Sequence, residues 1–161
     1  LTPLFGSLYD RKGKGATIMM IGASILIAVH ALFAVPFLSH WLIAIVLILA
    51  LGVGFSLVPS AMWPSVPKII PEKQLGTAYA LIFWVQNWGL MGVPALIGWV
   101  LDKYCVTGQV MREGVSVNTY NYTLPMVIFT GFGLLALLFA YLLKVEDKKK
   151  GYGLQLPNIQ K

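Results

Sequence analysis

The apolar stretch from residue 75 to residue 101 carries polar side chains that could bind a solute. Tyr79, Phe83 and Gln86 recur there at positions i, i+4 and i+7, which places them near one face of a helix, and Asn87 follows about 100° further round. Amide side chains donate to carbonyl or carboxylate oxygens and accept from ammonium groups, which suits a zwitterionic solute. We therefore predict a substrate pathway formed by these four residues and Ser60. The alternative is that Gln86 or Asn87 bonds to a neighbouring helix as a packing contact.

A second cluster, Gly6-x-Leu8-x-Asp10-Arg11-x-Gly13-Lys14, precedes the first long apolar run. A carboxylate in such a loop can lie at the positive end of a neighbouring helix, and an arginine can pair with an acid on an adjacent loop. Such contacts would latch one side of a helix bundle shut. We therefore predict a gating loop of Gly6, Asp10, Arg11, Gly13 and Lys14, with Glu72 as the partner of Arg11. A basic loop with turn glycines would explain the charges, but it would not explain the aspartate.

The other reactive residue types stand alone. His30 lies within an apolar run that offers it no acidic partner, so we interpret it as a packed histidine rather than a proton relay. Cys105 has no second cysteine with which to pair. The sequence has no arrangement typical of a catalytic triad, a metal cluster or a phosphate loop, so we expect neither an enzyme nor a cofactor. Coupling to protons would need a titrating group elsewhere, because no carboxylate lies inside the runs.

Four apolar runs must position these clusters: residues 16–38, 41–64, 75–101 and 123–143. A helix needs about 20 apolar residues to cross a hydrocarbon core of about 30 Å, and each run reaches that length. The hydrophobic fraction is 58% and the charged fraction 11%, whereas soluble domains average about 25% charged residues. The sequence therefore predicts an all-α membrane protein with four transmembrane helices in a lipid bilayer.

The basic residues indicate which ends of these helices face the cytoplasm. Ten of the twelve lie in alternate connections, namely Arg11, Lys12, Lys14, Lys68, Lys73, Lys144, Lys148, Lys149, Lys150 and Lys161, while Lys103 and Arg112 lie on the other side. By the positive-inside rule the carboxyl terminus is expected in the cytoplasm. Because the basic residues occupy short loops and the tail rather than one polar face, we expect no nucleic-acid partner.

The two middle runs also contain residues that soften helices. Proline removes a backbone hydrogen bond and glycine eases bending and close packing, so we predict helix bending at Pro59, Pro64, Gly89, Gly92 and Pro94. We divide the chain into residues 1–15, which hold the end of a preceding helix interrupted at Gly6 and the loop, residues 16–143, which form the membrane part, and residues 144–161, a flexible cytoplasmic tail. Residues 102–122 are expected to form a long outer loop.

The cluster at residues 6–14 resembles the loop signature of the major facilitator superfamily, in which Gly, Asp, Arg, Gly and a second basic residue join two helices on the cytoplasmic side. About residues 57–92 resemble more closely the branch of that superfamily that contains a lysosomal dipeptide transporter and its bacterial relatives. The motifs are Trp63-Pro64, then Pro71-Glu72-Lys-Gln74-Leu75-Gly76-Thr77-Ala78-Tyr79, then Gln86-Asn87-Trp-Gly89. The resemblance implies that the chain forms helices nine to twelve, the last third of a twelve-helix transporter, and that the missing N-terminal part is its partner.

The same resemblance implies secondary-active or facilitative transport of a small polar solute by alternating access. Dipeptides or similar zwitterions are the expected solutes, and protons are a further candidate partner. The expected location is the cell (inner) membrane, or the lysosomal membrane if the protein is eukaryotic. Two alternatives stay open: a transporter of this superfamily for sugars or organic anions, and a non-transporting four-helix membrane subunit for assembly or sensing.

Overall fold

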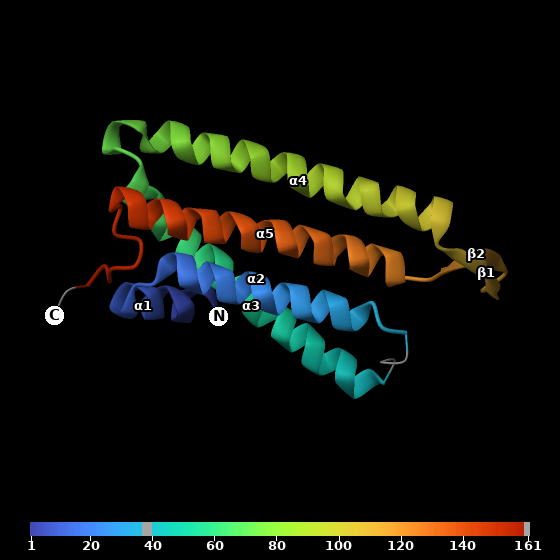
Figure 1. Ribbon diagram of the computed structural model, residues 1–161. Coiled ribbons are helices and arrows are strands. Elements are labelled where there is room, and N and C mark those ends of the chain that lie inside the picture. Colours follow the sequence, from blue (N-terminus) through green and yellow to red (C-terminus); the bar gives the residue numbers. More distant parts are fainter. Residues whose placement is uncertain (37–39, 160–161) are drawn as a thin grey trace.

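The computed structural model describes residues 1–36 and 40–159 (Figure 1). Its elements, in order, are α1 (Thr2–Lys12), α2 (Gly15–Phe33), α3 (Trp41–Ile69), the 3-10 turn η1 (Glu72–Gln74), α4 (Leu75–Tyr104), β1 (Val106–Arg112), β2 (Val115–Tyr120) and α5 (Thr123–Lys150). Four of the described helices are long and apolar enough to cross a membrane. The prediction of an all-α membrane fragment is therefore confirmed, although the predicted end of the first run, residues 37–38, lies outside the described residues.

Helix α2 is the centre of the packed part, because it lies against both α3 and α5 (Figure 1). Two glycines allow α2 and α3 to approach closely: a methyl group on Gly54 would lie 3.2 Å from the carbonyl oxygen of Gly22. A methyl group on Gly133 of α5 would similarly lie 2.7 Å from Cγ1 of Ile27 on α2. Small residues at helix crossings are typical of membrane helices, which gain their association energy from close packing rather than from the hydrophobic effect.

Helix α4 stands apart from this packed part (Figure 1). All of residues 75–104 are described, and Val100 is the single buried residue among them. Its membrane span also has the lowest mean hydropathy of the four, 1.4 against 2.1 to 2.7. The most polar span is thus the one whose surface the rest of the described chain leaves uncovered.

Local sequence explains where the helices end. Helix α3 ends at Ile69 because the next residue, Ile70, precedes Pro71 and adopts the extended conformation that a following proline imposes (φ −106°, ψ 132°). Helix α5 ends at Lys150 because the next residue, Gly151, takes the left-handed conformation (φ 69°, ψ 36°) common just after helix C-termini. The expected interruption at Gly6 is wrong, since α1 runs through it to Lys12 and a methyl group there would meet nothing within 4 Å.

The expected outer loop at residues 102–122 is largely a β-hairpin instead. Strands β1 and β2 are antiparallel, and Arg112 pairs with Val115 across a two-residue turn at Glu113 and Gly114. Both turn residues have positive φ (50° and 82°), which matches the twist of a two-residue hairpin. The hydroxyl of Tyr120 donates to Oδ1 of Asp102 at 2.8 Å. This hydrogen bond raises the pKa of Tyr120 above its ordinary value, because the neutral hydroxyl is the form that can donate.

The expected flexible tail at residues 144–161 also differs in the structure. Helix α5 continues to Lys150, and residues 151–159 fold back against the start of the chain, where Leu154 is completely buried. Figure 1 shows this tail beside α1 and opposite the hairpin. We call this end of the bundle the basic end, since it holds the chain segments with Arg11, Lys12, Lys14, Lys68 and Lys148 to Lys150.

Candidate functional site

An aromatic group joins α3 to the start of α4. The ring centroids of Trp63 and Phe83 lie 5.0 Å apart at an interplanar angle of 28°, and those of Trp63 and Tyr79 lie 5.8 Å apart at 38°. Two of the predicted pathway residues therefore contact one side chain of the neighbouring helix. Trp63 belongs to the quoted Trp-Pro motif but was absent from the predicted site, and its position directly before Pro64 is the signal that could have included it.

The hydroxyl of Tyr79 has a backbone partner on α3. It donates to the carbonyl oxygen of Trp63 at 3.3 Å. In a regular helix that carbonyl would accept from the residue four positions later, but that residue is Pro67, which has no N–H. Tyr79 therefore satisfies a polar group that a proline leaves free within a membrane helix, and it connects the two polar spans.

The remaining predicted pathway residues diverge from this group. Gln86 and Asn87 are exposed, and Nδ2 of Asn87 donates to the carbonyl oxygen of Phe83 at 2.9 Å within the same helix. Asn87 also lines a shallow depression of about 190 Å³ with Trp84, Trp88 and Met91. Ser60 is buried, and its hydroxyl donates to the carbonyl of Leu57 at 2.7 Å. The structure thus brings Tyr79 and Phe83 together on Trp63, whereas Asn87 bonds only to the backbone of Phe83 within α4 and Ser60 bonds to the backbone of α3.

The predicted bending residues lie inside continuous helices. Pro59 and Pro64 are within α3, and Pro94 is within α4. Gly89 and Gly92 lie on α4, where an added methyl group would meet nothing within 4 Å. Bending at these positions stays a prediction.

The predicted gating loop binds the C-terminal tail. The backbone carbonyl of Asp10 accepts from the amides of Asn158 and Ile159 at 2.9 and 3.0 Å, and Oδ1 of Asp10 accepts from Nδ2 of Asn158 at 2.7 Å. The amides of Lys14 and Gly15 donate to the carbonyls of Gln155 and Leu154, at 3.0 and 2.9 Å. The aspartate therefore bonds to the tail rather than lying at the start of another helix. No sequence signal identified Asn158, because its role depends on how the tail folds back.

Gly13 is required by this contact. Its backbone has φ 67° and ψ −138°, a conformation that residues with a side chain rarely adopt. A methyl group at Gly13 would lie 2.4 Å from the carbonyl oxygen of Gln155. The glycine of the motif thus allows the loop and the tail to touch through their backbones.

The end of α3 also contacts the C-terminal tail, at what we call the junction of loop and tail. Nζ of Lys68 donates to the carbonyls of Gly153 and Leu156, at 3.2 and 2.9 Å, and lies 5.1 Å from the centre of the Tyr9 ring. Tyr9 is completely buried, and its hydroxyl lies 3.4 Å from Oγ of Ser65. On α5, Oδ1 of the buried Asp147 accepts from the amide of Leu154 at 3.0 Å. One tail segment therefore connects α1, α2, α3 and α5.

The predicted pair of Arg11 and Glu72 is absent from this structure. Both residues are exposed, and the one ion pair within residues 1–36 and 40–159 joins Lys150 to Glu146. The loop forms its hydrogen bonds with the C-terminal tail rather than with Glu72. Sequence alone could not show which of the two contacts the loop, since Glu72 and the C-terminal tail are both far from it along the chain.

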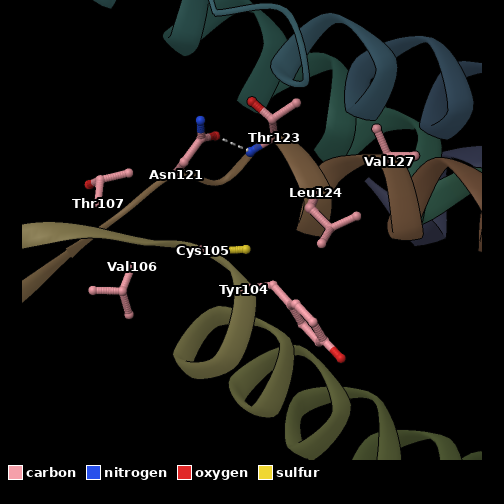
Figure 2. A pocket seen from close by; sticks show the side chains of 8 residues that line it. All are labelled: Tyr104, Cys105, Val106, Thr107, Asn121, Thr123, Leu124 and Val127. Atoms are coloured by element: carbon pink, nitrogen blue, oxygen red, sulfur yellow. Dashed lines mark hydrogen bonds between the residues drawn. The ribbon is translucent and has the colours of Figure 1, made fainter.

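A separate cavity of about 380 Å³ lies at the opposite end, between the end of α4, the hairpin and the start of α5 (Figure 2). Cys105 is buried beside it, and its carbonyl accepts from the amide of Asn121 at 2.8 Å. Oδ1 of Asn121 accepts in turn from the amide of Thr123, the first residue of α5, at 2.9 Å (Figure 2). These contacts position the hairpin and engage the backbone amide and Oδ1 of Asn121.

Comparison with known proteins gives consistent matches. The family described as Major Facilitator Superfamily matches residues 1–157. The chain is similar to the lysosomal dipeptide transporter MFSD1 of Mus musculus, with 39% identity over 128 residues, and to that of Danio rerio, with 34% identity over 155 residues. These alignments cover 80% and 96% of this chain but 26% and 29% of the relatives. The chain thus spans between a quarter and a third of the length of these relatives, and no solved structure matches it.

Proposed function

Because this chain belongs to the major facilitator superfamily, we propose that it is part of a membrane transporter that moves dipeptides or similar zwitterions by alternating access. The resemblance of the sequence motifs to this superfamily is therefore confirmed. The superfamily consists of transporters and not of enzymes. The dipeptide preference rests on the printed names of the relatives and on the chemistry of α4.

One observation carries this proposal: α4, the most polar of the four membrane spans, exposes an amide beside an aromatic group. Gln86 follows Phe83, which stacks on Trp63, by about one turn and is exposed. An amide side chain facing hydrocarbon would lack hydrogen-bond partners, which is unfavourable. A water-filled pathway or a polar partner removes this cost. A peptide backbone, a carboxylate and an ammonium group are all partners that an amide can bind.

The tail junction gives the proposed transporter a second functional part. In alternating access, two halves rock about a central site, and contacts at one end hold that end closed. The hydrogen bonds of Asp10 and Lys14 to the tail and those of Lys68 to it lie at one end of the bundle. We infer that loop and tail together stabilise one arrangement of the helices at this end, with Arg11 free to contact the remainder of the transporter.

The proposed orientation places the basic end and the C-terminus in the cytoplasm. Its support is the distribution of Lys and Arg, of which Lys103 and Arg112 lie towards the hairpin. The membrane of residence is proposed to be the cell membrane, or the lysosomal membrane in a eukaryote. Proton coupling would use a titrating group outside the four spans. Cysteine labelling from either side of the membrane and cell fractionation test these statements.

The deciding experiment is uptake of labelled dipeptides by proteoliposomes that carry the full-length protein, with and without a pH gradient. Saturable dipeptide uptake supports the proposal, and its response to the gradient reports on protons. Sugar or organic-anion flux without dipeptide uptake would keep the fold and overturn the substrate. Absence of any flux would favour a non-transporting membrane subunit.

A matched pair of variants tests the role of Gln86. Gln86→Ala should raise KM for dipeptide about tenfold, since a hydrogen bond to a charged group contributes about 1.5 kcal/mol. Gln74→Ala changes the same residue type at the exposed N-terminal end of α4 and should leave KM unchanged. A Gln86→Ala protein that is less stable but has an unchanged KM would instead assign Gln86 to helix packing.

A further inference from the structure

An apolar groove runs along α2 beside α5 and is independent of the proposed solute pathway. It encloses about 440 Å³, and Met20, Ile21, Ile25 and Ala28 supply its apolar wall. Lys144 of α5 and Thr17 of α2 line it as well. Ile21 and Ala28 are exposed, so the groove opens on the outer side of the helices.

The polar groups along the wall are already satisfied. The hydroxyl of Ser24 donates to the carbonyl of Met20 at 2.9 Å, and the hydroxyl of Thr17 donates to Oε1 of Gln155 at 3.1 Å. Lys144 differs from them: within the described residues the one ion pair is that of Lys150 with Glu146, so no carboxylate neutralises Lys144. The groove is therefore apolar along its length, with one ammonium group at one end.

The length of the groove matches one leaflet of a bilayer. Ala28 is eleven positions after Thr17, which is about 16 Å along a helix at 1.5 Å per residue. This is roughly half of a hydrocarbon core of about 30 Å. Thr17 lies near the start of α2 and Lys144 near the end of α5, which is the basic end of the bundle. The groove thus begins at the membrane surface and ends near the bilayer centre.

We propose that this groove binds an anionic phospholipid, with one acyl chain along Met20, Ile21 and Ile25 and the phosphate on Lys144. Basic residues at the end of membrane helices attract anionic headgroups, and a groove between helices orders an acyl chain. Lys148 follows Lys144 by one turn of α5 and is exposed, which adds a second positive charge on the side of the headgroup. This inference depends on the membrane fold and not on the transported solute.

Native mass spectrometry of the detergent-purified full-length protein tests the proposal with two lipids of identical dioleoyl chains, phosphatidylglycerol and phosphatidylcholine. Phosphatidylglycerol should bind more tightly, and Lys144→Ala should weaken it about fivefold, equivalent to about 1 kcal/mol. Phosphatidylcholine binding should not change. Lys103→Ala removes one positive charge at the opposite end, over the Trp99 ring, and should leave both affinities unchanged.

A variant with a filled groove distinguishes lipid binding inside the groove from attraction of lipid to the general surface charge. Ile21→Trp places a large side chain in the open groove and should abolish the effect of adding Lys144→Ala, because the two changes then act on the same lost site. Equal binding of the two lipids, or equal effects of Lys144→Ala and Lys103→Ala, overturns the proposal. So does an undiminished effect of Lys144→Ala in the Ile21→Trp protein. If Ile21→Trp lowers thermal stability without changing lipid binding, a protein helix covers the groove and the proposal is also wrong.

Discussion

Leu154→Ala should release the C-terminal tail from the basic end of the bundle. Leu154 is completely buried, and its backbone bonds to Asp147 and Gly15. Truncating a buried leucine to alanine costs about 2–5 kcal/mol, since transferred area and a cavity both contribute. At about 1.4 kcal/mol per factor of ten, the open population of the tail should rise at least about 30-fold.

Hydrogen exchange measured by mass spectrometry reads this opening directly. The amides of Lys14, Gly15 and Leu154 donate to partners within the junction, so their protection from exchange should fall by the same factor. Leu156→Ala is the matched control: the same residue type, two positions away, is 59% exposed. A surface change of this kind stays within about 0.5 kcal/mol, or roughly twofold in exchange.

Two results would refute this reasoning. Equal loss of protection in both variants would mean that burial of Leu154 does not hold the tail. Unchanged protection in Leu154→Ala, with the membrane helices intact by circular dichroism, would mean that the backbone hydrogen bonds suffice without the leucine.

Three further changes test other parts of the structure. Gly54→Ala should lower the free energy of unfolding by about 1–3 kcal/mol, because the added methyl group overpacks the close contact of α2 and α3. Thermal unfolding should show a lower Tm than for Gly52→Ala, where the added methyl group meets nothing within 4 Å. Equal Tm values would argue against the close crossing. Tyr79→Phe keeps the ring contact but leaves a carbonyl of α3 unpaired, so the free energy of unfolding should fall by about 1–3 kcal/mol, and an unchanged value would show that another group satisfies that carbonyl. Asp10→Asn keeps the backbone bonds to the tail but weakens the charge-assisted bond to Asn158. A cysteine probe at the basic end should therefore become more accessible, though less than in Leu154→Ala. Greater accessibility in Asp10→Asn than in Leu154→Ala would remove Asp10 from the proposed gate.

The sequence predicted the four spans because apolar length is a local property. Runs of over 20 apolar residues can hardly be anything except membrane helices. The β-hairpin was missed although local signals were present: Val106, Val110, Val115 and Val117 flank the two-residue turn at residues 113–114. Such β-branched residues around a glycine-containing turn favour a hairpin. The length and polarity of residues 102–122 by themselves indicate only a loop.

The loop and tail show what sequence could not give. The Gly and Asp positions of the loop motif were identified, but their partners lie about 140 residues away, in a segment without apolar periodicity. Leu154 is buried because of how an irregular segment folds back, and irregular segments have no repeat that predicts a buried face. The proposed pairing of Arg11 with Glu72 rested on charge alone, and charge does not determine which of several distant groups is closest.

The junction of loop and tail also has a consequence for biosynthesis. A ribosome makes the amides of Lys14 and Gly15 about 140 residues before their acceptors on Leu154 and Gln155. At 5–20 residues per second, the interval is roughly 10–30 s. During that time water must hydrate the loop, and the connection between α1 and α2 stays unfixed until residues 154 and 155 have been made. Closure of this junction is therefore expected to follow the synthesis of all four spans, however early the individual helices enter the membrane.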